Sequence, residues 1–294
     1  MSRPPQNAAG ALFGNHARES SAAGGRGTVI MYEHHIESAQ RLKEYFAGKE
    51  GVIAVIWGGS TVKGNERPDS DIDAIVVVTD EKYAVLERER RTAEVITGYC
   101  TYDGGYFDVK YKTKGTLAEA AQHGSEPTRN AYVRARVLWT LDGEIPALVE
   151  NIARYPEHEV PAKLECFCAD LQLNRGYFLK VVSPDNAYMR AHLAQQIVYS
   201  VYRLILLENR VLFPCNRRLE ETVRACKKRP EHILELGREF LGNVCEETCE
   251  AFVGAFWKQS ALPLFDDVSK SCACYVKYYE DWWRAERPPV PDEW

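Results

Sequence analysis

Two short apolar runs in the first third of the chain predict neighbouring strands that are buried on both faces. The first run is Val52–Trp57, which stops at Gly58-Gly59-Ser60, and the second covers residues 74–78. Runs of five or six β-branched and small residues between turn signals favour strands that are covered on both sides. The polar stretch between the two runs predicts a tight turn, followed by no more than a short helical piece.

Helical and strand patterns continue around these two runs. A pattern of strand, Asp103-Gly104-Gly105 and strand follows the second run, which is a strong hairpin signal. His34 and His35 are neighbours on a predicted helix and diverge by about 100 degrees, which predicts a solvated helix end rather than a ligand pair. In chain order we predict helices at 34–47 and 81–93, hairpin strands at 95–102 and 106–111, helices at 116–123 and 129–136, a strand at 137–140 and a helix at 145–155.

After Pro161 the pattern predicts helices only. The expected helices cover residues 163–182, 188–208, 218–227, 230–241, 246–260 and 273–286. The proline-bounded stretch 156–161 therefore predicts a boundary between an α+β domain at 31–158 and a bundle of five or six helices at 159–294. The last helix carries one aromatic stripe, which we interpret as core packing rather than a stacking platform. Its members are Tyr275, Tyr278, Tyr279, Trp282 and Trp283.

Composition narrows the class of protein. Residues 1–30 are rich in Ala, Gly and Ser, and we expect a disordered leader, an expression remnant or an upstream start ahead of Met31. The net charge of −5, from 37 basic and 42 acidic residues, argues against a long nucleic acid as partner. No apolar segment approaches the ~20 residues of a membrane span. The nine cysteines lack a disulfide framework, which favours buried free thiols in a cytoplasmic protein, with a zinc site as the alternative.

The segment around the first apolar run also carries candidate chemistry. Gly58 and Gly59 let the backbone approach a bound group, and Ser60 would open a helix with a hydroxyl and free N–H groups for an anion. Asp71 and Asp73 are two residues apart, so on a strand both carboxylates project to the same face. Crowded carboxylates need a cation, and Mg²⁺ that carries phosphate oxygens is the usual one. The segment therefore predicts a phosphate cradle beside a metal site.

The order of these residues resembles the signature of the DNA polymerase β-like nucleotidyltransferase superfamily. Gly59-Ser60 is followed after ten residues by Asp71 and Asp73, and the Arg-Pro-Asp-Ser lead-in is similar to that of aminoglycoside adenylyltransferases. The resemblance covers residues 52–111 and implies a small mixed β-sheet with flanking helices, followed by an all-α domain. It also implies metal-dependent transfer of a nucleoside monophosphate to a hydroxyl of a small acceptor, such as an aminoglycoside or lincosamide. AMP from ATP or another NTP would be transferred with two Mg²⁺ ions, and pyrophosphate would leave.

The same resemblance implies roles for further residues. Asp108, on the second hairpin strand, matches the family's third carboxylate and would complete the catalytic metal site, although a salt bridge with Lys110 is the alternative. Some aminoglycoside enzymes have a glutamate there as general base, so the shorter Asp108 leaves open which group takes the proton. Ser70 would join Gly59 and Ser60 around the triphosphate. Arg217 falls where relatives carry a phosphate-binding lysine, with a plain surface residue as the alternative.

Two other functions stay open at this point. One is the same chemistry on a protein hydroxyl, as in antitoxin-like adenylyltransferases, and the other is a non-catalytic nucleotide-binding regulator of the same fold. Other enzyme templates are excluded, because the sequence has no G-x-x-x-x-G-K-[ST] phosphate loop, G-x-G-x-x-G fingerprint, H-E-x-x-H motif or G-x-S-x-G elbow.

Overall fold

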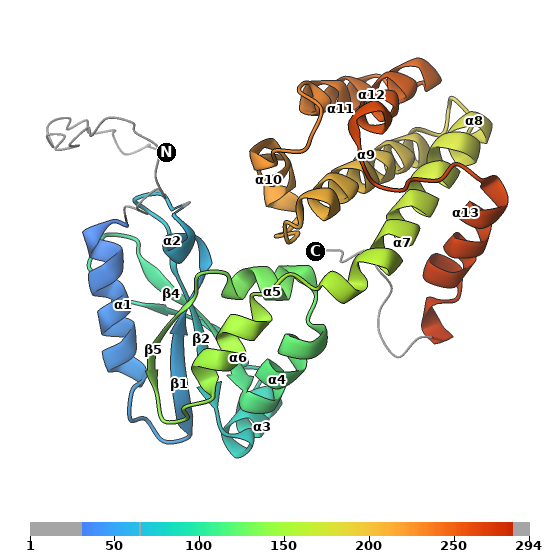
Figure 1. The fold of residues 1–294 in the computed structure, drawn as a ribbon. Helices are drawn as coiled ribbons and strands as arrows, with labels where there is room; N and C mark the ends of the chain where they lie inside the picture. The colour runs from blue at the N-terminus through green and yellow to red at the C-terminus, as the bar shows by residue number, and fades with distance from the viewer. Residues whose placement is uncertain (1–30, 65, 285–294) are drawn as a thin grey trace, which may run out of the picture. The chain divides into compact units, whose positions relative to one another are not determined.

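The computed structural model describes residues 31–64 and 66–284 of the 294-residue chain. The predicted leader, residues 1–30, lies outside these ranges. The described residues belong to one compact unit. Its N-terminal part contains a β-sheet with helices on both faces, and its C-terminal part is helical (Figure 1).

The sheet has five strands in the spatial order β3-β4-β2-β1-β5. Strands β2 and β4 are parallel, whereas the other neighbouring pairs are antiparallel, so the predicted small mixed sheet of an α+β fold is confirmed. The strands are β1 Val52–Trp57, β2 Ile72–Val78, β3 Ala93–Thr97, β4 Tyr106–Thr113 and β5 Arg136–Thr140. The helices around them are α1 Glu33–Phe46, α2 Gly59–Lys63, α3 Asp80–Arg88, α4 Lys114–His123, α5 Glu126–Tyr132 and α6 Ile145–Ile152.

Helices on each face of the sheet bury a separate apolar core. Helix α1 packs Leu42 and Phe46 against one face, together with Trp57 of β1. Helices α4, α5 and α6 cover the opposite face, where Leu117 and Ile152 are fully buried (Figure 1). Burial of one such side chain is worth about 1.5–3 kcal/mol, so both cores hold the central strands β1 and β2 firmly. This rigid pair of strands positions the candidate site.

The boundaries of α3, β3 and α5 are among those that differ from the prediction, and each of these three differs for a local reason. Helix α3 starts after Thr79, whose side chain caps it, and is followed by Arg90 at φ +56°, so β3 already begins at residue 93. Strand β3 ends at Thr97 because Gly98 adopts φ +82°, which turns the chain away from the sheet. Helix α5 begins earlier than predicted because the side chain of Ser125 caps its first turn.

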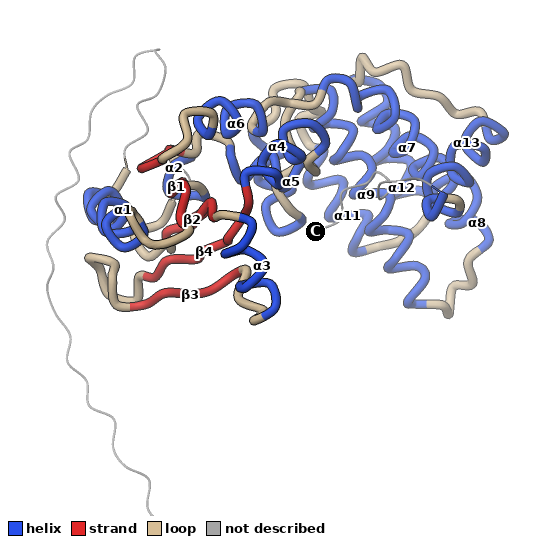
Figure 2. Tube along the Cα trace, turned by 90° about the horizontal axis from the view of Figure 1, so that it is seen from below, coloured by secondary structure: helices blue, strands red, loops and turns tan. Residues whose placement is uncertain are grey.

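The C-terminal part is a set of helices packed around α7 and α9 (Figure 2). Its core includes the fully buried side chains of Phe167, Phe213 and Phe252. No described helix is both long enough and apolar enough to cross a membrane. The α-helices are α7 Val160–Leu173, α8 Leu179–Val181, α9 Ala187–Asn209, α10 Leu219–Ala225, α11 Ile233–Gly242, α12 Glu246–Gln259 and α13 Val268–Tyr275. Shorter turns are η1 Glu157–Glu159, η2 Asn174–Phe178, η3 Asn216–Arg218, η4 Val276–Glu280 and η5 Trp282–Arg284.

Two interpretations from the sequence are wrong in detail. His35 is fully buried rather than solvated, and neither of its ring nitrogens has a hydrogen-bond partner among the described residues. The aromatic stripe packs only in part, because α13 gives way to a π-helical turn that breaks the helical spacing. Tyr279 reaches the buried thiol of Cys166, whereas Trp282 and Trp283 are 50% and 69% exposed. All nine cysteines are free thiols, and six of them are buried.

Candidate active site

The three predicted carboxylates meet on one face of the sheet. Asp73 of β2 is in register with Asp108 of β4, and Asp71 directly precedes β2. Side chains in register on neighbouring strands project to the same face. One oxygen atom from each of these three aspartates lies within 4.8 Å of the other two. Within residues 31–64 and 66–284, no other group of three or more acidic, histidine or cysteine side chains comes together in this way.

The central carboxylate of this cluster carries strong electrostatic strain. Burial and the negative charge of Asp71 raise the pKa of Asp73 to about 6, and Asp108 adds to this effect. The positive charges of Lys110 and Lys63 act in the opposite direction but do not cancel it. Three crowded oxygen donors with an unrelieved negative charge are the donor set that hard divalent cations prefer. The residues therefore fit a Mg²⁺-type ion.

The glycine turn lies directly beside the carboxylates. Gly59 has φ +75°, and a Cβ atom at this position would lie 1.7 Å from Oδ2 of Asp73. The N–H of Gly58 donates a hydrogen bond of 3.0 Å to the carbonyl of Asp73. Ser60 follows in the first turn of α2, which begins at Gly59. The structure therefore places Gly59 directly beside Asp73, with Ser60 as the next residue, and their contact with a phosphate stays a prediction.

Ser70 shapes the loop that leads into Asp71. Its hydroxyl accepts a hydrogen bond of 2.9 Å from the N–H of Arg67, and its carbonyl accepts one from the hydroxyl of Tyr102. The Ser70 side chain is therefore engaged within the loop, next to the first carboxylate. Its contact with a triphosphate stays a prediction.

The sequence left open whether Asp108 belongs to the carboxylate cluster or forms a salt bridge with Lys110, and the structure shows both contacts. Asp108 joins the carboxylate cluster and also pairs with Lys110, whose Nζ lies 3.6 Å from Oδ2 of Asp108. Tyr106, two residues earlier on β4, is a neighbour that sequence reasoning missed. The charge of Asp71 raises the pKa of its hydroxyl, so the phenol lies close to the cluster. The alternating pattern of β4 was the available signal, because Tyr106, Asp108 and Lys110 share one face.

Arg217, the predicted phosphate contact, lies exposed in the turn η3 of the helical part. Its neighbour Arg218 pairs with Glu221 at 2.7 Å, and Arg218 and Cys215 both act electrostatically on Lys63 of α2. This turn therefore approaches the glycine turn of the sheet, and the role of Arg217 stays a prediction.

Lys63 is a further residue that sequence reasoning missed. It lies three positions after Ser60 on α2, and its Nζ donates a hydrogen bond of 2.7 Å to Oδ1 of Asn130. The spacing of three residues was a usable signal, because side chains at i and i+3 share a helix face. The partner Asn130 was not predictable, since it lies on α5, far away in the sequence.

Part of the sequence that contains this site matches a known protein family. Residues 39–103 match the family model described as a nucleotidyltransferase domain. The chain carries a nucleotidyltransferase domain. The matched segment contains Gly59, Ser60, Asp71 and Asp73, which are the residues on which the resemblance was based. The predicted superfamily and the predicted enzyme class, a nucleotidyltransferase, are therefore confirmed.

Two solved structures are similar to this chain. One is a nucleotidyltransferase-like protein from Exiguobacterium sibiricum 255-15, with 12% identity and a TM-score of 0.46 over 88% of this chain and 83% of that chain. The other is spectinomycin adenyltransferase AAD(9) from Enterococcus faecialis with ATP and spectinomycin, with 14% identity and a TM-score of 0.27 over 78% of this chain and 100% of that chain. No curated protein matches the sequence. The assignment rests on the family match alone.

Proposed function

We propose that this nucleotidyltransferase moves AMP from ATP to a hydroxyl of a small acceptor and releases pyrophosphate. The observation that carries the proposal is the cluster of Asp71, Asp73 and Asp108 directly beside the glycine turn at Gly59. A backbone turn without a Cβ atom accommodates a bulky anion, and three carboxylates accommodate the cation that accompanies it. Nucleotide transfer needs these two features next to each other.

The three aspartates would hold Mg²⁺. Their fit is supported by the all-oxygen donor set and by the raised pKa of Asp73, which a bound cation would reverse. When bound, Mg²⁺ stabilises the negative charge that develops on the transferred phosphoryl group and its leaving group.

The order of the strands supports an assignment of the two substrates to opposite sides of the carboxylates. The glycine turn follows β1, Asp73 lies on β2, and Asp108 lies on β4, next to the edge strand β3. In-line transfer places the attacking and leaving oxygens on opposite sides of the phosphorus. The triphosphate would then lie over β1 and α2, and the acceptor over β4 and β3. Val95 of β3 is in register with Asp108 and 62% exposed, so it offers apolar surface to the acceptor on that side.

The reaction exchanges one phosphorus–oxygen bond for another. The acceptor hydroxyl forms a bond to the α-phosphorus, and the bond from that phosphorus to the pyrophosphate oxygen breaks. The carboxylate of Asp108 lies on the acceptor side. Because one of its oxygens pairs with Lys110, the other would either hold the cation or receive the hydroxyl proton, and it is our candidate for the proton when Asp71 and Asp73 hold the cation.

The proposal is tested by pyrophosphate release from ATP with Mg²⁺ and a panel of aminoglycosides, lincosamides and other hydroxylated small molecules. We expect turnover with at least one acceptor. The double exchange of Asp71→Asn with Asp73→Asn is expected to lower it by at least about 1000-fold, equal to about 4 kcal/mol. A wild type that releases no pyrophosphate with any nucleotide or acceptor contradicts the enzymatic proposal. A mass increase of AMP on a protein instead would select a protein acceptor.

Cation binding is expected to depend on pH through Asp73. Because its pKa lies near 6, above the ordinary value of about 3.9, ionisation of Asp73 makes the metal-free protein less stable as the pH rises between these values. At pH 7.5, Mg²⁺ at 100 times its Kd should raise the free energy of unfolding by up to ~2.7 kcal/mol, which would be visible as a higher melting temperature. Below pH 6 the affinity should fall about tenfold per pH unit, because protons compete. Calorimetric titration at pH 5 to 8 checks this, and a pH-independent affinity contradicts it.

A further inference from the structure

We propose that Lys63 binds the triphosphate of the donor nucleotide and that Asn130 of α5 holds it in position. The inference rests on the proposed function, to which it adds a residue that contacts the donor. Lys63 lies outside the residues that the sequence motif had pointed to.

The position of Lys63 on α2 directs it to the glycine turn. It follows Gly59 by four residues and Ser60 by three, and side chains at these spacings share one helix face. Its Nζ donates a hydrogen bond of 2.7 Å to Oδ1 of Asn130, and its carbonyl oxygen accepts a hydrogen bond of 2.8 Å from Nη1 of Arg134. Lys63 is therefore fixed at both its backbone and its ammonium group.

The ammonium group of Lys63 lacks a close negative partner. Among the described residues, no carboxylate lies within 4.0 Å of its Nζ, and Asn130 supplies only a neutral amide oxygen. Burial lowers the pKa of Lys63, whereas the charge of Asp73 acts to raise it. A cation bound to the aspartates would remove much of that attraction. The Lys63 ammonium group would then need another anion, and the triphosphate is the anion that the donor brings.

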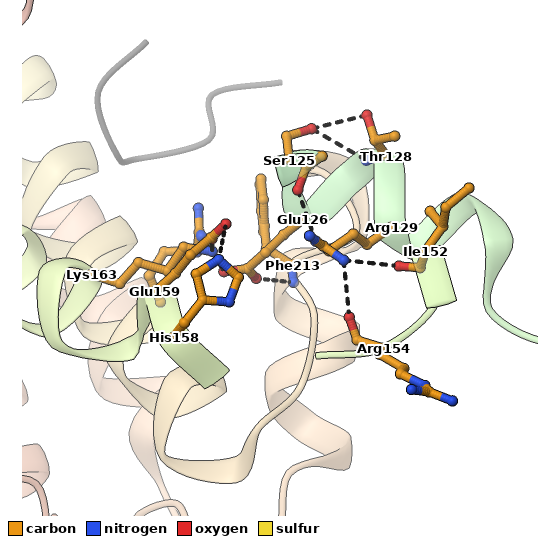
Figure 3. A network of polar contacts seen from close by, with 12 residues as sticks. Ser125, Glu126, Thr128, Arg129, Ile152, Arg154, His158, Glu159, Lys163 and Phe213 are labelled. Atoms are coloured by element: carbon orange, nitrogen blue, oxygen red, sulfur yellow. Dashed lines mark hydrogen bonds and ion pairs between the residues drawn. The ribbon is translucent and has the colours of Figure 1, made fainter. Parts of the chain in front are cut away.

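Helix α5 connects this lysine to a buried ionic network. At its C-terminal end, the carbonyl of Ala131 lies 3.1 Å from where a Cβ on Gly58 would stand, so α5 packs against the glycine turn as well as Lys63. At its N-terminal end, Glu126 contacts Lys163 of α7 and accepts a 2.6 Å hydrogen bond from the N–H of Phe213 (Figure 3). Side chains held on such a fixed support lose little freedom when they bind a ligand.

The first experiment measures binding of tripolyphosphate in the presence of Mg²⁺ by calorimetry. Tripolyphosphate carries the phosphates without base or sugar, so it isolates the proposed contact. Lys63→Met is expected to weaken its binding by about 10- to 100-fold, the worth of a charge-assisted hydrogen bond. Lys63→Arg should recover most of the affinity because it keeps the charge. Lys82→Met removes an exposed lysine on α3 and is the matched control, with unchanged affinity expected.

A second variant separates binding from a purely structural role. Asn130→Ala keeps the ammonium group of Lys63 but removes the hydrogen bond that holds it in place. We therefore expect a smaller loss of tripolyphosphate affinity, of about 2- to 10-fold. Mg²⁺ affinity without tripolyphosphate should stay unchanged in Asn130→Ala. In Lys63→Met it should not fall, because the loss of a positive charge that acts on Asp73 does not weaken cation binding. If Lys63→Met does not fold, the tripolyphosphate affinities of Lys63→Arg and Asn130→Ala, compared with that of the wild type, still test the role of Lys63.

The outcomes distinguish this inference from the proposed function. Wild-type affinity for tripolyphosphate in folded Lys63→Met, alongside pyrophosphate release by the wild type, overturns the role of Lys63 and leaves the function standing. Tight tripolyphosphate binding that depends on Lys63, without turnover on any acceptor, supports Lys63 and contradicts the function. A wild type that binds neither tripolyphosphate nor ATP with Mg²⁺ overturns both.

Discussion

Gly59→Ala is expected to reduce pyrophosphate release by at least about 100- to 1000-fold while the protein stays folded. A Cβ atom here would lie 1.7 Å from Oδ2 of Asp73 and 2.4 Å from its Cγ, so the carboxylate has to move by more than an ångström. Misplacing a reacting group by this distance costs on the order of 100-fold, and the lost metal ligand adds to it. Initial rates with Mg²⁺ and ATP measure the effect.

A second glycine separates this steric effect from backbone strain. Gly48 adopts φ +77°, close to the +75° of Gly59, but a Cβ atom there would meet nothing within 4 Å. Gly48→Ala therefore carries the same left-handed strain, on the order of 1–2 kcal/mol of stability, without touching the carboxylates. We expect Gly48→Ala to keep wild-type turnover. Equal losses of activity in the two variants would falsify the steric explanation.

Glu126→Gln is expected to lower the free energy of unfolding by about 3–5 kcal/mol, the cost of breaking a buried ionic network. Glu126 contacts Lys163 (Figure 3), and the two residues are 2% and 1% exposed. Nη2 of Arg203 lies 3.2 Å from Oε1 of Glu126. Glutamine keeps the size of the side chain but removes its charge, so Arg203 would face a neutral amide there, and Lys163 would retain its ion pair with Glu159 at 2.8 Å. Urea denaturation of both proteins at pH 7 measures the difference.

The effect of Glu126→Gln should also depend on pH. Burial alone would raise the pKa of Glu126, but Arg203 and Lys163 outweigh burial and hold it below its ordinary value. Its stabilisation is therefore complete above the unfolded pKa of about 4.3 and is lost as the pH falls through the lower folded value. The difference in the free energy of unfolding between the wild type and Glu126→Gln should therefore become smaller in strong acid. Glu250→Gln breaks a more exposed pair with Arg175 and is the control, with a loss below about 1 kcal/mol expected.

The local features of the site could be predicted from the sequence. The two apolar runs, the glycine turn and the two-residue spacing of Asp71 and Asp73 are all encoded within 27 consecutive residues, 52–78. Asp108 was assigned from the family resemblance, whereas strand alternation by itself indicated only that Asp108 and Lys110 share one face. These features depend on short-range sterics and burial, which a single sequence carries.

The remaining features depend on contacts that span the chain. Asn130 reaches Lys63 across 67 residues, and Glu126 meets Arg203 across 77. Neither pairing leaves a periodic signal in the sequence. The burial of His35 was missed for the same reason, because the rings that surround it include Tyr102 from a distant loop.

The parallel pairing of β2 with β4 has a consequence for the order of folding. Asp73 and Gly59 come together across 14 positions of the chain (59 to 73), through the antiparallel pair β1–β2. Asp73 and Asp108 meet only after 35 positions (73 to 108) have closed into a loop that contains α3 and β3. Closing the longer loop costs more entropy, so the parallel contact is expected to form after the hairpin-like one. The formation of this parallel pair therefore also brings the third negative charge against the other two, and a divalent cation present at that moment would favour the pairing.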